Sequence, residues 1–480
     1  MGLRQFEINL DELSKNETLR LCSPYVLPII GYKYDKFNDY IELCESGNRP
    51  KGGISELETG EAISLGAEQI NVDGSVDLQK TPYVSCEYYN SANKGKVKDN
   101  DILICKDGAL TGKTCIVDLS LFPTKEIMVN EHVFIFRGND KIDQRFLFYF
   151  TRSSVFQSQV KDLAYRKKAQ PGLNLDHLKK IKIPAIPKKE QARIVETIEP
   201  IEQKIKQLNL QIKEPQEIIN QVFVKEFKID LKRTGEEEQK KQFHVTSTFA
   251  FRNQNLRSSV RWHKVAPIQQ VMYKNTKCIK KLGDYIVSAR NGWSPCCRES
   301  DTLSLVFGVD CISKNGVINF KDMKFSDETC PQIDSYFAQL DDLFVSRGNT
   351  VDLVALASVV ENLPEENDII FPDLFIKLDI DQKVLEKKYL AYLFNSVIGR
   401  YYFKYAAKGK NQTMVKISSD ELNGFFLPVP KLDVQQRIVD EIKTKLDAQE
   451  IIKVDIDAVR KNIDKIIEDA IKDTIGVGPS

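Results

Sequence analysis

The chain has 480 residues, of which 42% are hydrophobic and 29% charged, a composition typical of a globular protein and not of a disordered one. Lys and Arg number 69 against 68 Asp and Glu, a formal net charge of +1, which excludes a protein that coats nucleic acid through its overall charge. No apolar run reaches the roughly 18 residues of a membrane span, and the first residues mix both signs of charge, unlike a signal peptide. We therefore expect a cytoplasmic protein.

Cysteine and histidine patterns predict neither disulfides nor a metal site. The ten cysteines form no Cys-x-x-Cys pair, and several lie in apolar runs such as residues 101–105. Free thiols in a reducing compartment are expected from this pattern. The chain has only four histidines, none of them paired at helical ligand spacing, so we expect no bound metal.

The two halves of the chain repeat each other. Residues 37–50 recur at 282–295, 66–76 at 308–318, 101–106 at 342–347 and 183–195 at 427–439. The order is the same and the offset changes little, from 245 (282 − 37) to 241 (342 − 101). This pattern indicates a tandem duplication of a unit about half the chain long.

Each half begins with short β-rich runs (133–136, 305–307, 343–345) and continues with aromatic helical stretches (144–150, 389–394), which predicts a mixed α/β domain. A long polar helix follows each domain. Apolar residues spaced 4, 3, 4, 3, 4 form a narrow stripe in both helices, at 194, 198, 201, 205, 208 and 212, and at 452, 456, 459, 463, 466 and 470. Such a stripe favours pairing of the two helices, and the alternative is that each helix docks on its own domain.

Two interruptions of the helical region are expected. Pro200 and Pro215 lie inside the first stripe region and should kink or end that helix. Residues 231–242 are charged and contain Gly235, which predicts a solvated linker between the halves.

The sequence contains no complete catalytic motif. The run Gly108-Ala-Leu-Thr-Gly-Lys-Thr114 has three residues, where a P-loop needs four, between its first glycine and Gly-Lys-Thr, and Asp107 precedes it. We interpret it as a hairpin turn that offers Lys113 to a backbone phosphate. The run 372–377 lacks the carboxylate of a metal-nuclease motif and is expected to be a strand. Neither an adenine-methyltransferase motif nor a Ser-His-Asp arrangement is recognisable.

Basic residues are clustered at equivalent places in the two halves, in 161–189 and 400–416, and amide side chains accompany each cluster. Lys and Arg neutralise phosphates, and Gln and Asn can pair with adenine edges. The alternative is a solvated surface whose interleaved aromatic residues turn into the core. The candidate DNA-binding residues are Arg49, Lys51, Lys113, Arg166, Lys167, Lys168, Gln170, Arg290, Arg298, Arg347, Lys404, Lys408, Lys410, Asn411 and Gln412.

These features resemble the specificity (S) subunits of type I restriction–modification enzymes, over nearly the whole chain. The strongest similarity lies in the two Pro-x-x-x-Gln-x-Arg-Ile-Val-like boxes at 187–195 and 430–439, of which the second has one extra residue. The entry of each half (37–50 and 282–295) and the run 409–422 add to it.

The resemblance implies an α+β (mixed) fold with two pseudo-repeated α/β target-recognition domains, each reading half of a bipartite DNA site, separated by two long antiparallel helices in a coiled coil. On this view the chain comprises target-recognition domain 1 (1–187), a first long helix (188–228), a linker (229–258), target-recognition domain 2 (259–430), a second long helix (431–474) and a tail (475–480). The residues expected to pair the helices or contact partners are Arg193, Ile194, Ile198, Ile201, Ile205, Leu208, Arg437, Ile438, Ile456, Val459, Ile463 and Ile466.

The resemblance further implies a non-catalytic chain that binds double-stranded DNA and two methyltransferase (modification) subunits. Restriction subunits would add ATP-driven translocation and cleavage, and S-adenosylmethionine, ATP and Mg would be bound by these partners. Two rival hypotheses remain: a nuclease or nucleoside-triphosphatase with degenerate motifs, and a coiled-coil scaffold without a DNA role.

Overall fold

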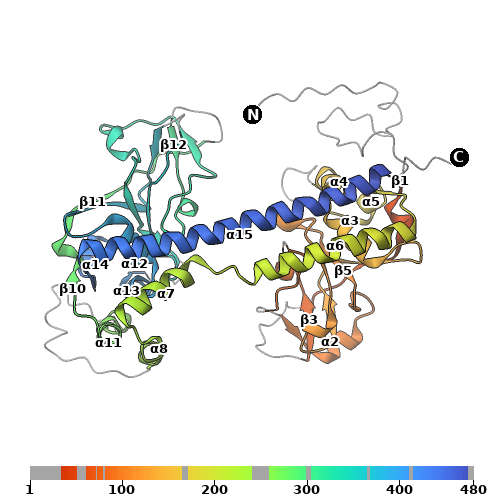
Figure 1. The fold of residues 1–480 in the computed structure, drawn as a ribbon, viewed down its shortest axis with the longest axis horizontal. Helices are drawn as coiled ribbons and strands as arrows, with labels where there is room; N and C mark the ends of the chain where they lie inside the picture. The colour runs from red at the N-terminus through yellow and green to blue at the C-terminus, as the bar shows by residue number, and fades with distance from the viewer. Residues whose placement is uncertain are drawn as a thin grey trace. The chain divides into compact units, whose positions relative to one another are not determined.

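The computed structural model describes residues 34–50, 61–71, 73–78, 82–164, 171–240, 259–298, 304–364, 368–409 and 414–473. The chain forms two compact units, unit 1 with residues 1–210 and 455–480 and unit 2 with residues 211–454 (Figure 1). Each unit combines short strands with helices, which confirms the mixed α+β class. No helix in the described ranges is long and apolar enough to cross a membrane.

Unit 1 contains a four-stranded antiparallel sheet of order β2-β8-β5-β6, a three-stranded sheet of order β4-β3-β7, and a β1·β9 pair. Its strands are β1 (Tyr34–Lys36), β2 (Ile41–Ser46), β3 (Ala62–Leu65), β4 (Tyr83–Val84), β5 (Ile102–Cys105), β6 (Thr114–Ile116), β7 (Ile127–Val129), β8 (Val133–Gly138) and β9 (Lys182–Pro184). Its helices are α2 (Cys86–Ser91), α3 (Gln144–Arg152), α4 (Ser154–Ala164), α5 (Leu175–Leu178), α6 (Lys188–Asn209) and the end of α15 (Leu432–Asp473).

Unit 2 repeats this topology, with a four-stranded sheet of order β11-β18-β14-β16, a three-stranded sheet of order β13-β12-β17 and a β10·β20 pair. Its strands are β10 (Ile279–Lys281), β11 (Ile286–Asn291), β12 (Ser304–Val306), β13 (Lys324–Ser326), β14 (Leu343–Ser346), β15 (Gly348–Asn349), β16 (Ala357–Val359), β17 (Asp368–Ile370), β18 (Phe375–Ile380), β19 (Val415–Lys416) and β20 (Phe426–Pro428). Its helices are α7 (Pro215–Phe227), α8 (Leu231–Gln239), α10 (Val260–His263), α11 (Val265–Met272), α12 (Lys387–Asn395), α13 (Val397–Ala406), α14 (Ser419–Asn423) and the first part of α15.

The predicted duplication is confirmed strand by strand. In both three-stranded sheets the middle strand pairs antiparallel with one neighbour and parallel with the other. The runs 133–136 and 343–345 are strands, the run at 305 begins inside β12, and the aromatic runs 144–150 and 389–394 lie in α3 and α12, as predicted. The run 372–377, expected to be a strand, is strand only from Phe375, where β18 begins, and residues 373–374 form a turn.

Aromatic and aliphatic side chains fill the space between each four-stranded sheet and its helices. In unit 1, Phe136 from β8 packs with Phe37 and with Phe146, Phe150 and Phe156 from the helices, all of them fully buried. In unit 2, Leu378 from β18 lies in one cluster with Tyr389, Leu390 and Phe394 of α12. The helices therefore cover one face of each four-stranded sheet.

Helix α15 contributes to the cores of both units, whereas α6 contributes to the core of unit 1. Ile194 and Ile198 of α6 lie in the core of unit 1 together with Ile467 and Ala470 of α15, and Ile463 and Ile466 pack against that core. Ile438 at the start of α15 lies instead in the core of unit 2, together with Ile219 and Phe223 of α7. The start of each long helix thus docks on the domain that precedes it in the chain. The end of α15 completes the core of unit 1, and α7, which follows α6, completes the core of unit 2.

Two equivalent glutamines join each long helix to its preceding domain. Gln191 accepts a hydrogen bond from the Asp143 N–H at 2.7 Å and donates to the Ile186 carbonyl at 2.8 Å. Gln435 accepts from the Glu386 N–H at 2.9 Å and donates to the Pro430 and Val384 carbonyls at 2.7 and 2.8 Å. Because α6 begins at 188 and α15 at 432, both glutamines are the fourth residue of their helix. The extra residue of the second box therefore lies before the helix.

The structure also corrects the predicted linker and locates the prolines. Residues 231–239 form helix α8, which packs on α11, so that part of the segment expected to be a solvated linker is folded. Pro215 opens helix α7 after a break that follows α6, in accord with the prediction that it ends the first helix. Pro200 lies within α6, which continues through it.

Candidate nucleic-acid interface

In unit 1 two of the predicted basic residues, Arg49 and Lys113, lie at the same end of the four-stranded sheet. Ser46 pairs with Phe134, Cys105 with Val133, and Ile104 with Thr114, so the end of β2, the start of β8 and the β5–β6 turn share one edge. The segments beyond this edge are 47–50, 106–113 and 131–132, which we call sheet-end surface 1. Arg49 and Lys113 both lie on it.

A chain of polar contacts between charged side chains and a histidine crosses sheet-end surface 1. The Arg49 Nε lies 3.0 Å from the Glu131 carboxylate. The His132 ring lies between two carboxylates, 3.4 Å from Glu131 and 3.2 Å from Asp107, and the Lys106 ammonium is 3.8 Å from Asp107. These groups are partly exposed, and Glu131 is the ion-pair partner of Arg49. Glu131 was not identified from the sequence, because it is separated along the chain from Arg49.

Residues 171–173 of the first basic segment lie beside the same surface. The Gly108 N–H donates to the Pro171 carbonyl at 3.0 Å, and the Leu173 N–H donates to the Lys106 carbonyl at 2.7 Å. The candidates Arg166, Lys167, Lys168 and Gln170 precede Pro171 and lie outside the described residues, as does Lys51. The residues that follow them, 171–173, are hydrogen-bonded to the β5–β6 turn.

Unit 2 has the equivalent surface. Asn291 pairs with Ile376, Ser346 with Phe375, and Val345 with Ala357, so segments 292–298, 347–356 and 371–374 share one sheet edge, which we call sheet-end surface 2. Arg290 is exposed and donates to the Ser335 carbonyl at 3.3 Å. Arg298 is exposed and lies 3.0 Å from Asp327.

Arg347 occupies the place in unit 2 that Lys106 has in unit 1. The Ile417 N–H donates to its carbonyl at 2.9 Å, and the following strand β15 pairs with β19, next to the second basic segment. The Arg347 guanidinium donates to the Asp373 carbonyl at 3.2 Å. Lys410, Asn411 and Gln412 lie outside the described residues. The structure thus brings Arg347 beside the ends of the segment that contains them.

The other members of the second cluster are engaged by acids and by the core. Lys404 forms an ion pair with Glu238 of α8 at 2.8 Å, and Lys408 with Glu421 at 2.8 Å. Arg400 turns inward to the Val354 carbonyl, and burial lowers its pKa to about 10. Tyr402, Phe403 and Tyr405 lie in the core, in accord with the alternative reading of these aromatic residues. The sequence could not anticipate the two ion pairs, because Glu238 lies 166 residues from Lys404 (404 − 238).

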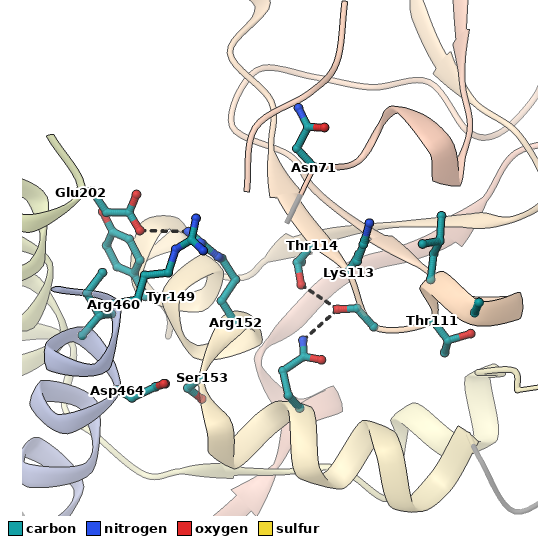
Figure 2. A pocket seen from close by; sticks show the side chains of 15 residues that line it. Asn71, Thr111, Lys113, Thr114, Tyr149, Arg152, Ser153, Glu202, Arg460 and Asp464 are labelled. Carbon is teal, nitrogen blue, oxygen red and sulfur yellow. Dashed lines mark hydrogen bonds and ion pairs between the residues drawn. The ribbon is translucent and has the colours of Figure 1, made fainter. Parts of the chain in front are cut away.

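Lys113 lies in a turn, as predicted, since β5 and β6 form an antiparallel hairpin around it. Its side chain lines a pocket of about 310 Å³ (Figure 2), together with Arg152 of α3 and with Glu202 and Arg460 of the long helices. Among the described residues Lys113 has no ion-pair partner.

The ends of the two central strands opposite the sheet-end surfaces are held by buried ion pairs. Arg137 of β8 donates to both carboxylate oxygens of Asp101 at 2.8 and 2.7 Å. In unit 2, Lys377 of β18 is 2.7 Å from Asp342. Lys377 therefore has a structural role, and the described ranges contain no cluster of three metal-ligating side chains. The chemistry that this arrangement offers is charge and hydrogen bonding at two sheet ends.

Comparison with known proteins identifies the class. Residues 36–218 match the sequence model of the type I restriction modification DNA specificity domain. This match covers residues 36–218 and supports the resemblance to type I specificity subunits seen in the sequence, and with it a role in recognition of a DNA target. Specificity subunits are the non-catalytic recognition component. No curated protein matches the chain.

Solved structures of low identity also resemble the chain. One belongs to work on complex assembly and conformational transition of the type I R-M system; it is 15% identical, with 93% of this chain and 99% of that chain covered and a TM-score of 0.43. The HsdS subunit from Thermoanaerobacter tengcongensis is 15% identical, with 93% and 98% covered and a TM-score of 0.32. The S subunit from M. genitalium is 12% identical, with 93% and 97% covered and a TM-score of 0.39. With TM-scores below 0.5, the assignment rests on the family match.

Substituting Arg290 by alanine should weaken DNA binding uniformly across sequences, because an exposed guanidinium that neutralises one phosphate contributes to affinity and not to base selection. The slope of log K against log salt should fall by about 1. Salt titrations of duplex binding measure this, and Lys232→Ala, at an exposed lysine of α8, is the control. Equal slopes for the two variants would contradict the assignment of Arg290 to the interface.

Proposed function

We propose that sheet-end surfaces 1 and 2 each read one part of a bipartite double-stranded DNA target. The observation that supports this is the repetition of the same surface in both units: equivalent strand ends, equivalent basic residues at 106 and 347, and equivalent hydrogen bonds to the carbonyls of these two residues from Leu173 and Ile417. Lys and Arg at such a surface bind phosphates, and Asn and Gln can read adenine. Two different loop sets in one chain would give two different half-sites.

The long helices would set the distance between the half-sites and pair as antiparallel strands of a coiled coil. Helix α15 is continuous over 42 residues, about 63 Å at 1.5 Å per residue, and supplies core residues to both units. The pairing stripe has Ile198, Ile205 and Ile456 buried. A helix that is part of both cores is a physical means of fixing a spacer.

The chemistry would come from partner subunits. Two methyltransferase subunits that bind S-adenosylmethionine would dock on the helices, and restriction subunits would supply ATP- and Mg-dependent translocation and cleavage. This chain would contribute no catalytic group and would act where the DNA is, in the cytoplasm. The enzyme hypothesis predicts instead DNA cleavage or ATP hydrolysis by the purified chain that is lost in Lys113→Ala or Lys377→Ala.

Selection from random duplex DNA, with a methyltransferase subunit present, tests the proposal. A split motif, two short specific parts separated by a fixed gap, is expected. Exchange of residues 347–356 and 408–416 for those of another specificity subunit should change one part only. Failure to recover any motif would favour a coiled-coil scaffold.

Inserting four residues into α6 after Leu208 and four into α15 after Asp447 should lengthen the preferred spacer by one or two base pairs. The insertion adds about 6 Å of helix, and a base pair of B-DNA occupies about 3.4 Å. The same selection assay measures the spacer. A four-residue insertion after Lys240, outside both long helices, is the control and should leave it unchanged. An unchanged spacer in the helix variant would show that the helices do not set it.

A further inference from the structure

The pocket beside Lys113 is a second feature of unit 1 with its own chemistry. Its walls come from the β5–β6 turn, the end of α3 and the two long helices, with Lys113, Tyr149, Arg152, Glu202, Arg460 and Asp464 among the lining residues (Figure 2). Its volume of about 310 Å³ lies at the small end of the range of ligand sites. Three cations and two acids face this one space.

The acids of the pocket are already engaged. Glu202 forms an ion pair with Arg152 at 2.9 Å, and both side chains are largely buried. The Asp464 carboxylate accepts the Ser154 N–H at 3.1 Å, and burial raises its pKa. Neither acid is therefore the partner of Lys113 or of Arg460.

Arg460 has hydrogen-bonding capacity that the described residues do not satisfy. Its Nε–H is buried and has no acceptor among them, and its nearest acid is Asp457, 3.8 Å from Nη1. A buried N–H without an acceptor is costly, so such groups in native proteins call for an explanation. Together with the unpaired Lys113, Arg460 leaves the pocket with an excess of positive charge.

Unit 2 shows that the fold does not need these charges. At the equivalent positions it has Gln216 for Arg460, Asn220 for Asp464 and Asn395 for Arg152. Gln216 donates to the Asn395 carbonyl at 3.2 Å, and Asn220 accepts the Val397 N–H at 2.6 Å. The Asn395 side chain bonds the backbone of Ala357. The same junction is thus closed by neutral hydrogen bonds in unit 2.

We propose that the unit 1 pocket binds a phosphate group, carried by a small molecule no larger than a mononucleotide. A guanidinium and an ammonium are the side chains best suited to phosphate oxygens, one through directed N–H groups and the other as a point charge. The bound phosphate would connect the β5–β6 hairpin, through Lys113, to the long helices α6 and α15. This assigns Lys113 to the pocket in addition to its predicted DNA contact, and it does not depend on the DNA-reading proposal.

Calorimetric titration of the purified full chain with inorganic phosphate, and separately with adenosine monophosphate, tests this. Binding should weaken by about ten-fold in Arg460→Gln and in Lys113→Gln, since each removes a charge-assisted contact. Lys461→Gln, on the exposed side of α15, is the control and should bind like the parent. Glutamine is the residue of unit 2 at this position, so Arg460→Gln should fold, which circular dichroism verifies.

The source of the phosphate is distinguished by competition. Displacement of inorganic phosphate by a non-target duplex would support the phosphate site and assign its occupant to the DNA backbone, whereas displacement by adenosine monophosphate alone supports the small molecule. Absence of binding of all three probes, or equal affinity of the parent and Arg460→Gln, would overturn the proposal.

Discussion

Replacing Arg137 by methionine is expected to lower the free energy of unfolding by about 3 kcal/mol, the lower end of the range for breaking a buried ion pair by removal of one partner. Asp101 is 1% exposed and accepts both N–H groups of Arg137 as well as the Lys98 N–H. Methionine keeps much of the packing of the side chain but leaves the carboxylate charged and buried. Urea unfolding measures the change.

The control for this variant is Arg145→Met. Arg145 also pairs with a glutamate, Glu199, but its side chain is 55% exposed. Exposed pairs contribute about 0–1 kcal/mol, so the loss should be small. If the two variants lost the same stability, Asp101 would not be the desolvated group that its burial indicates. The variant Asp101→Asn/Arg137→Met should recover part of the loss, because it removes the unpaired charge.

Replacing Gln435 by alanine should lower the free energy of unfolding by about 1–3 kcal/mol, because it leaves one N–H and two carbonyls, all partly buried, without their side-chain partner. The side chain is fully buried and joins α15 to the Glu386 N–H and the Val384 and Pro430 carbonyls. The loss should appear in unit 2, to which these residues belong. Denaturant unfolding followed by hydrogen exchange of α12 and α15 amides measures it.

Gln436→Ala is the matched control, one residue further along the same helix. Gln436 is exposed and bonds only the Asp440 carboxylate one turn away. Its loss should therefore cost less than about 0.5 kcal/mol. The equivalent Gln191→Ala should destabilise unit 1 as Gln435→Ala destabilises unit 2. Equal effects of the 435 and 436 substitutions would contradict the role of the box glutamine.

Hydrophobic periodicity and repetition made much of the fold predictable. The repeats placed equivalent strands and helices in the two halves, because equal patterns of apolar residues bury equal faces. Pro215 located a helix boundary, since proline cannot occupy an interior helical position without loss of a hydrogen bond. The charged run 231–239 was wrongly predicted to be a solvated linker. It forms helix α8, which packs on α11, and its own composition gave no sign of this packing.

The charge pattern was harder to interpret. Local sequence around Lys404 and Lys408 contains no acid, yet both lysines are paired by acids from other parts of the chain. Electrostatic pairing depends on distance in space, so a basic cluster in sequence need not be a basic surface. Glu131 and His132 were missed for the same reason, and only the strand register places Glu131 beside Arg49 and His132 beside Asp107.

From the near-neutral 480-residue sequence alone, two copies of one mixed α/β unit joined by helical segments could be predicted. The sequence also showed no recognisable catalytic motif and a resemblance to specificity subunits. These properties follow from residue order and periodicity. Tertiary structure alone decided which basic residues share a sheet end, which are paired by distant acids, and which line the pocket of unit 1. Strand pairing and helix packing bring together side chains that lie tens to hundreds of positions apart, and no local pattern encodes that proximity.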